Sequence, residues 1–232
     1  MDKAPFSIVF QVQYTIMARK LGTDTRMFTF FRSILSSMKN SGEDHGDDRT
    51  IVIAQLDARV QPIDRGDYFA DPLDDVLQSS GSGEVTGGGT QLAGEPDGIA
   101  YCDIEIMVNE LSKATIQEII STLEELGAPK GSVLKLPEGR NDIAFGSLEG
   151  MALFLNGTDL PAEVYEQSDV NDLISRCEAL VEGGGRFRGF WEGSSETALY
   201  FYGKSFDDMK LSIEDLLATD PLCAMARVVK IA

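Results

Sequence analysis

Apolar and polar residues follow one another with two different periods along this chain. In residues 51–60 every second side chain is apolar, and this period predicts a strand with one buried face. In residues 113–126 the apolar side chains recur every three or four positions, which predicts a helix with one buried stripe. Both periods return towards the C-terminus, so the chain predicts a protein of mixed strands and helices.

Residues 51–138 and 139–232 each predict a strand, a helix, two strands, a helix and a strand. In the first region these are strand 51–60, helix 71–80, strands 84–92 and 99–108, helix 113–126 and strand 132–136. In the second region they are strand 151–156, helix 169–182, strands 186–191 and 197–202, a helix capped by Ser205, and strand 226–231. This order is the split βαβ arrangement of ferredoxin-like domains.

Three short motifs of the first region recur in the second at a nearly constant distance. Residues 75–77 recur after 97 positions, the glycine triplet 87–89 after 96, and residues 133–136 after 95. This small drift indicates a duplicated unit, and the long period indicates two domains rather than a solenoid. We therefore predict an α+β fold of two tandem ferredoxin-like βαββαβ repeats, at 51–138 and 139–232. Each would form an antiparallel sheet in strand order 4-1-3-2 with helices on one face.

Residues 1–50 stand outside this repeat. Alternation in residues 8–16 predicts a strand, and apolar residues at helical spacing in 27–38 predict a helix. An acidic, glycine-containing linker at 40–49 follows. Because the helix stripe is too apolar to face water, we expect this strand-helix extension to dock on a repeat or on another subunit.

The composition predicts a soluble cytoplasmic protein. Hydrophobic residues make up 43% of the 232 residues, and the apolar runs are shorter than the roughly 20 residues that a membrane helix needs. The N-terminus has no unbroken apolar region of the kind found in signal peptides. Cys102, Cys177 and Cys223 each lie in an apolar run without C-x-x-C spacing, so we interpret them as buried thiols in a reducing compartment.

The charge balance bears on the class of partner. The chain has 38 acidic and 20 basic residues and a net charge of −18. Such a surface repels nucleic-acid phosphates and favours basic proteins or cations. We therefore expect a basic protein partner and no nucleic-acid or membrane partner, while solubility alone is the alternative reason for the charge.

Strand alternation gathers charges on the predicted open face of the first sheet. The side chains are Asp57 and Arg59 on the first strand, Asp103 and Glu105 on the third, and Lys135 on the fourth. One interpretation is a binding site for a polar ligand or a cation. The alternative is a set of cross-strand ion pairs on a solvated sheet, which the interleaving of acids and bases favours.

The corresponding face of the second sheet is predicted to be aromatic. Arg188, Trp191, Tyr200 and Tyr202 lie on two paired strands, and aromatic residues with arginine are typical of protein interfaces. The alternative is that this face packs on the first repeat or on the N-terminal helix.

Several kinds of chemistry find no support in the sequence. No helix and no Lys-Ser/Thr follow the glycine triplet 87–89, so we interpret the glycines of both repeats as positions where a strand bulges. The single histidine, His45, lies in the acidic linker, which argues against zinc sites and histidine-dependent catalysis. We predict no cofactor, no metal site and no catalytic residue.

Four segments carry a resemblance to other sequences. Residues 58–66, 71–73, 83–90 and 102–106 (ARVQPIDRG, DPL, GEVTGGGT and CDIEI) resemble uncharacterised bacterial proteins. The resemblance implies no activity and supplies no catalytic residue. The tandem βαββαβ order is also similar in topology to regulatory domains of the ACT type.

The leading functional hypothesis is an acidic protein-interaction module, and one form of it would neutralise a basic partner as immunity proteins do. The alternative is a small-molecule sensor of ACT-like architecture with its ligand between the repeats. An enzyme using Asp57, Asp103 and Glu105 is the third hypothesis. Apolar residues in 27–38 and the aromatic second face also make a homodimer a candidate assembly.

Overall fold

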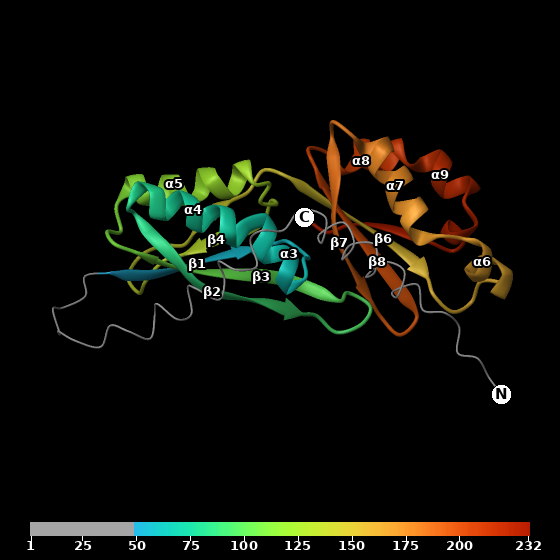
Figure 1. Cartoon of the computed structure of the whole chain (residues 1–232), viewed down its shortest axis with the longest axis horizontal. Coiled ribbons are helices and arrows are strands. Elements are labelled where there is room, and N and C mark those ends of the chain that lie inside the picture. Colours follow the sequence, from blue (N-terminus) through green and yellow to red (C-terminus); the bar gives the residue numbers. More distant parts are fainter. Residues whose placement is uncertain (1–48) are drawn as a thin grey trace.

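The computed structural model describes residues 49–232, which form two halves, each an antiparallel sheet with helices on one face (Figure 1). The strand and helix predicted in residues 8–38, the acidic linker and His45 lie outside the described residues. The helices of both halves lie along the same side of the molecule (Figure 1). The protein is therefore of the α+β class, with two antiparallel sheets.

The elements follow the predicted order with additions. The first half contains β1 (Thr50–Leu56), α3 (Pro62–Arg65), the π-helical turn η1 (Gly66–Ala70), α4 (Asp71–Ser80), β2 (Gly83–Leu92), β3 (Ile99–Val108), α5 (Lys113–Glu125), β4 (Ser132–Lys135) and β5 (Ile143–Phe145). The second half contains β6 (Glu149–Asn156), α6 (Ala162–Gln167), α7 (Val170–Val181), β7 (Gly185–Glu192), β8 (Glu196–Gly203), α8 (Phe206–Ser212), α9 (Glu214–Thr219), the 3₁₀ turn η2 (Pro221–Cys223) and β9 (Arg227–Lys230).

The two sheets share an order of strands. The first sheet is arranged β2-β3-β1-β4-β5 and the second β7-β8-β6-β9. Without the short β5, each order runs second, third, first and fourth strand of its half, and this is compatible with the predicted βαββαβ pattern. One face of each sheet packs with the helices around a hydrophobic core, and we call the opposite face the outer face.

Local signals in the sequence explain where the helices begin and end. The Ser112 hydroxyl accepts a hydrogen bond from the Thr115 amide at the start of α5, and the Asp169 side chain accepts one from the Asn171 amide at the start of α7. Gly81 adopts a left-handed conformation with φ of 70° after α4, as a helix C-terminus commonly requires. The three helices agree within one residue with the predicted ranges 71–80, 113–126 and 169–182.

The structure corrects the predicted end of the first strand. The alternating pattern continues to Val60, but β1 ends at Leu56, and α3 and η1 fill the predicted loop 62–70. Pro62 occupies the first turn of α3, where its missing amide costs nothing. Asp57 and Arg59 therefore lie beyond the strand and not on the sheet itself.

The structure also corrects the common role given to the glycine triplets. Residues 87–89 lie within β2, directly after a β-bulge between Val85 and Gly87. Residues 183–185 instead form the turn into β7, with Gly183 at a φ of 84°, and the bulge of β7 lies further on, between Phe187 and Gly189. The recurrence of the triplet thus reflects two different local needs.

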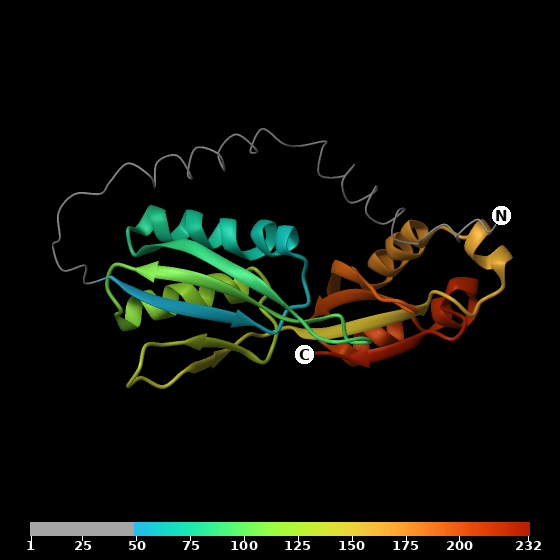
Figure 2. The ribbon, with the colours of Figure 1, turned by 90° about the horizontal axis from the view of Figure 1, so that it is seen from below.

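The two halves meet where the β2–β3 hairpin extends beyond the first sheet. The hairpin runs from the first half to the second, along the side opposite to the helices (Figures 1 and 2). In the described part of the chain, no helix combines the length and apolar character needed to cross a membrane.

Candidate functional site

The outer face of the second sheet is buried by the first half of the same chain. Ile99, at the start of β3, packs into a cluster with side chains of β6, β8 and β9 and is fully buried. The outer-face residues of β6 and β8 in this cluster are all at most 2% exposed; they are Ala152, Phe154, Ala198, Tyr200 and Tyr202. This contact, which we call the junction, is therefore a third hydrophobic core, which lies between the halves.

The loop of the β2–β3 hairpin supplies polar contacts to the junction. The Asp97 carbonyl accepts hydrogen bonds from Arg59 Nη1 at 3.0 Å and from the Tyr200 hydroxyl at 3.4 Å. The Glu95 carboxylate accepts bonds from the Ser194 amide at 2.9 Å and from the Ser194 hydroxyl. These bonds lower the pKa of Glu95, because they favour its ionised form.

A close approach of backbone to ring explains one glycine of this loop. Gly98 has a φ of 70°, and a Cβ atom there would lie 2.3 Å from the Trp191 ring. Any larger residue would clash with the ring as well as strain the backbone. Gly98 thus lets the hairpin lie directly on Trp191.

Tyr202 ties the end of β1 to the second sheet. Its hydroxyl accepts a hydrogen bond from the Arg59 amide at 2.7 Å and donates to the Asp57 carbonyl at 3.5 Å. Burial raises the pKa of Tyr202 because the phenolate would lose its hydration. Tyr202 is therefore a neutral phenol with both hydrogen-bonding roles satisfied.

Arg188 makes a further polar contact across the junction. Its Nη2 donates to the Leu126 carbonyl at 2.6 Å, and its guanidinium lies 4.6 Å from the centre of the Tyr68 ring and 5.7 Å from that of Phe69. Arg188 is only 6% exposed, and burial lowers its pKa to about 10. Its Nε has no hydrogen-bond partner, so the cation is held by one carbonyl and two aromatic rings.

All four residues predicted for an interface thus contact the first half of the same chain. Arg188 and Tyr202 do so as just described, Trp191 lies against Gly98, and Tyr200 donates to Asp97. A role for them in binding another protein stays a prediction, as does the ligand site predicted on the first sheet.

The residues of that predicted ligand site fall into two groups. Asp57 and Arg59 lie at the junction, where burial raises the pKa of Asp57 and the nearby Arg59 guanidinium opposes the rise. Asp103, Glu105 and Lys135 lie on β3 and β4, on the outer face of the first sheet. Two of the five side chains therefore follow the end of β1 and three lie on strands, and a ligand site formed by them stays a prediction.

The outer face of the first sheet is half-buried and chemically mixed. Glu105 accepts a hydrogen bond from the Thr86 hydroxyl at 2.7 Å, and Asp103 has a buried Oδ1 without a hydrogen-bond partner. The apolar side chains beside them are partly exposed; they are Ile51, Ile53, Tyr101, Met107 and Val133. This face offers both apolar area and unsatisfied polar groups, and such a combination suits binding more than catalysis.

The thiols offer little reactivity. Cys102, Cys177 and Cys223 are buried and not joined by disulfides, and burial raises the pKa of Cys102 to about 12 and that of Cys223 to about 11. A protonated thiol is a weak nucleophile. Within residues 49–232, no three His, Cys, Asp or Glu side chains are grouped so that they could hold a metal ion.

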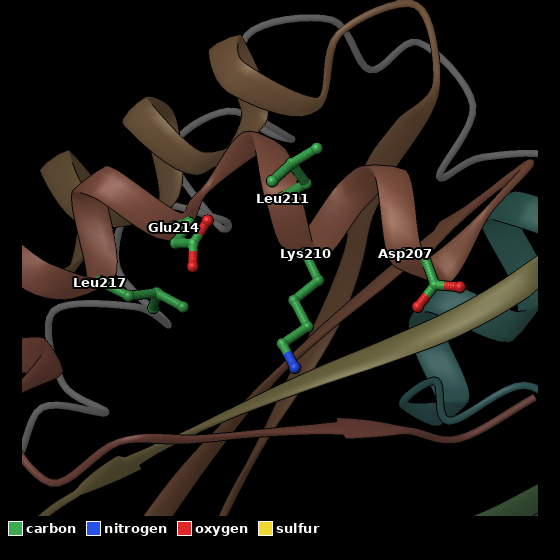
Figure 3. Close-up of a pocket in the computed structure, with 5 residues that line it drawn as sticks. All are labelled: Asp207, Lys210, Leu211, Glu214 and Leu217. Atoms are coloured by element: carbon green, nitrogen blue, oxygen red, sulfur yellow. The ribbon is translucent and has the colours of Figure 1, made fainter.

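Two shallow hollows lie among the helices of the second half. One is lined by Asp207, Lys210, Leu211, Glu214 and Leu217 from α8 and α9, and the Lys210 amine extends from α8 between the two acidic residues (Figure 3). The other lies between α6, α7 and η2, where Arg176 Nη1 is 2.7 Å from Asp220 Oδ2 and 3.4 Å from Asp172 Oδ2. Both hollows combine several carboxylates with one cation.

Sequence reasoning missed the residues of the hairpin loop that make the junction, above all Glu95, Asp97 and Gly98. One signal could have found them. Six residues separate β2 from β3, whereas three separate β7 from β8. The longer loop in the first half is the one that reaches the other sheet.

Comparisons with known proteins do not identify this chain. No protein-family model and no curated protein matches it. Among solved structures, it is similar to a crystal structure from Lactobacillus acidophilus NCFM described as a "putative monooxygenase", with 13% identity and a TM-score of 0.26. The match covers 79% of this chain and 94% of that one. A likeness at this score carries no argument about fold or activity, so the chain is assigned to no family.

Proposed function

We propose that this protein is an acidic protein-binding module that engages a basic protein partner through its helical side. The observation that carries the proposal is the distribution of charge among the elements. Residues 49–232 contain 32 acidic and 14 basic residues, a difference of 18 that equals the net charge of the whole chain.

Most of this charge is on the helices. The helical segments of the first half contain eight acidic and two basic residues, and those of the second half contain the same numbers. The nine strands contain six acidic and five basic residues, so the sheets are almost neutral. Because all these helices lie on one side of the molecule, that side is strongly negative (Figure 1).

A one-sided charge of this kind has a physical consequence for association. A negative surface raises the rate at which a positive partner arrives and orients it towards the helices. The two hollows in the second half add concave sites to such a surface, because each is lined by carboxylates beside apolar side chains. Neutralisation of a basic toxin-like protein is one function that such a surface would serve.

We further propose that the two halves are tandem copies of a ferredoxin-like unit. The shared strand order supports this, and so does the position of the β-bulges. In β2 the bulge follows the third residue of the strand, between Val85 and Gly87, and in β7 it also follows the third residue, between Phe187 and Gly189. Bulges are specific features of a fold, so a shared position favours common descent.

The first experiment neutralises the helical charge. The full-length chain carries four substitutions at exposed helical sites: Glu163→Gln, Glu166→Gln, Glu214→Gln and Asp215→Asn. Proteins retained by the immobilised wild-type chain are purified, and their affinities are measured by calorimetry at two salt concentrations. We expect the variant to bind a true partner at least about tenfold more weakly, with a smaller dependence on salt.

A matched variant separates the helical side from net charge. It removes the same four charges from exposed sites outside the helices: Glu84→Gln, Glu110→Gln, Glu138→Gln and Glu182→Gln. We expect it to retain nearly wild-type affinity. Equal losses in both variants would show that only net charge steers binding, and no loss in either would exclude the helical side as the binding surface.

The small-molecule sensor of ACT-like architecture is a second hypothesis for which the junction offers no favourable observation. The contact between the halves is filled by buried side chains of Phe154, Tyr200 and Tyr202. A thermal-shift screen of metabolites on the full-length chain tests it.

A further inference from the structure

Three residues form a row across the outer face of the first sheet. In the sheet register, Ile53 of β1 is paired with Lys135 of β4 on one side and with Glu105 of β3 on the other. Directly paired residues of neighbouring strands point to the same face. The row therefore presents a cation, an aliphatic side chain and an anion in that order.

The two charges of this row do not neutralise each other. They are two strand spacings apart, roughly 10 Å, which is too far for an ion pair. Within residues 49–232, neither Lys135 nor Glu105 forms an ion pair, and the Glu105 carboxylate bonds only to the Thr86 hydroxyl. Each charge is thus available to a group from outside the sheet.

We propose that a second copy of this chain packs on the outer face of the first sheet, with a two-fold axis that runs parallel to β1 over Ile53. A rotation about this axis reverses the direction across the strands and turns the face over. It therefore places Lys135 of each copy opposite Glu105 of the other, and Ile53 opposite its own counterpart. The surface is self-complementary, as a two-fold interface requires.

The direction of the axis follows from the charges. A two-fold axis perpendicular to the strands, in the plane between the sheets, would place each lysine opposite a lysine and each glutamate opposite a glutamate. Both axes keep the strands of the two sheets aligned, the usual arrangement of packed sheets, so the charges alone choose between them. Two ion pairs would then flank an aliphatic centre.

The remainder of the face supports a contact between copies. The partly exposed Ile51, Tyr101, Met107 and Val133 surround the row and supply apolar area. The strands of the first sheet carry three acids and one base, against eight acids and two bases on the helical segments of the same half, so two chains of net charge −18 repel each other less through this sheet than through their helical sides. A basic partner, by contrast, would meet the Lys135 amine at the centre of this face.

The second half supplies a precedent within the molecule. There the outer-face side chains of β6 and β8 are buried, and Ile99 of the β2–β3 hairpin is part of their cover. The outer face of the first sheet has the same position relative to its strands and helices but no such cover among the described residues. A second copy would give it an equivalent cover without any new element.

Charge reversal tests this arrangement in the full-length chain. Sedimentation velocity over a concentration series, up to about 100 μM, measures the dimer affinity of the wild type, Glu105→Lys, Lys135→Glu and the double variant. Each single reversal creates two like-charge contacts and should weaken the dimer at least about tenfold. The double variant exchanges the two charges and should recover most of the wild-type affinity.

Two exposed helical sites provide matched controls. Glu125→Lys and Lys113→Glu change the net charge of the chain by the same amounts and should leave the dimer affinity within about twofold of wild type. A monomeric wild-type chain overturns the proposal. So does a dimer that is insensitive to Glu105→Lys, since another surface would then form it. Failure of the double variant to recover overturns the proposed direction of the axis.

A crosslink identifies the axis independently of charge. Ile53→Cys places two thiols opposite each other across the axis. Because packed sheets lie about 10 Å apart, too far for a disulfide, a short bismaleimide should join the copies in high yield, as seen on denaturing gels. The same substitution at Val76, which is exposed on α4, should not crosslink. If residues 1–48 or another protein cover this face instead, the thiol of Ile53→Cys will be protected from labelling in a monomer. That result would overturn the proposal.

Discussion

The outer faces of the two sheets have the same place in the fold and opposite environments. The face of the second sheet is aromatic and lies under the β2–β3 hairpin, so Phe154, Tyr200 and Tyr202 are at most 2% exposed. The face of the first sheet is aliphatic and charged, and its Ile51 is 48% exposed. The difference follows from the loop lengths, because only the six-residue loop of the first hairpin extends far enough to cover a neighbouring sheet.

This contrast shows how one architecture can serve two purposes. Similar strands make an internal core in one half and leave a partly exposed face in the other half. The bulge positions illustrate the difference. Thr86 at the bulge of β2 is exposed, whereas Arg188 at the bulge of β7 is buried under the rings of Tyr68 and Phe69. The substitutions below test whether stability depends on the second face and not on the first.

The largest effect is expected from the aromatic core of the junction. Phe154→Ala removes a buried ring and leaves a cavity, so it should lower the free energy of unfolding by about 3–5 kcal/mol. Ile51→Ala on the first face should cost less than about 1 kcal/mol, because that side chain is already half in water. Urea unfolding measures the free energy of unfolding of both variants. Equal losses would contradict the contrast between the two faces.

Substitutions of the two bulge residues should differ less in the free energy of unfolding that they cost. Arg188→Ala removes the bond to the Leu126 carbonyl and the contacts with two rings, which should cost about 2–4 kcal/mol. Thr86→Ala should cost less than about 0.5 kcal/mol, as is usual at exposed sites. Thermal unfolding measures both. If Arg188→Ala were as stable as the wild type, this arginine would not hold the halves together.

Two tyrosines permit a more conservative test. Tyr202→Phe keeps the buried ring but removes the hydroxyl that bonds to the Arg59 amide and the Asp57 carbonyl, so it should cost about 1–2 kcal/mol. Tyr101→Phe on the first face should change stability by less than about 0.5 kcal/mol. Chemical denaturation measures the stability of both variants. A Tyr202→Phe variant as stable as the wild type would contradict the hydrogen bonds described at the junction.

The smallest effect concerns the pH dependence of the hairpin. The bonds from Ser194 lower the pKa of Glu95 from its ordinary value of 4.5, so the folded state favours the ionised carboxylate. The stabilisation is therefore complete above pH 4.5 and is lost as the pH falls through the lowered pKa. The Ala93 amide bonds to the Gly98 carbonyl, and its protection factor, which compares its exchange with that of an unstructured peptide at the same pH, should fall in acid.

Glu95→Gln is the control for this pH effect. It keeps a side chain of similar size but removes the ionisable group, so exchange at Ala93 should no longer respond to Glu95 ionisation. If wild type and variant showed the same acid response, the ion at Glu95 would have no part in anchoring the hairpin.

The sequence predicts local structure well and the assembly of the halves less well. The helix starts at Ser112, Asp169 and Ser205 and the hairpin strands on both sides of residues 93–98 agree with the structure, because each depends on a few neighbouring residues. The predicted end of β1 was wrong. The alternating pattern continues to Val60, although the chain has already left the sheet after Leu56. Asp57 and Arg59 of the predicted ligand site lie beyond the strand for that reason.

Periodicity, caps and turns, which act over a few residues, determined the α+β class, the order of the elements and the apolar and polar faces of each strand. The concentration of carboxylates in the helical segments is also written in the sequence. Which outer face is buried was decided only by the tertiary structure. That choice depends on contacts such as Asp97 with Tyr200 and Arg188 with Leu126, whose partners are 103 and 62 positions apart. No local pattern encodes such distant pairs, so only the folded chain brings them together.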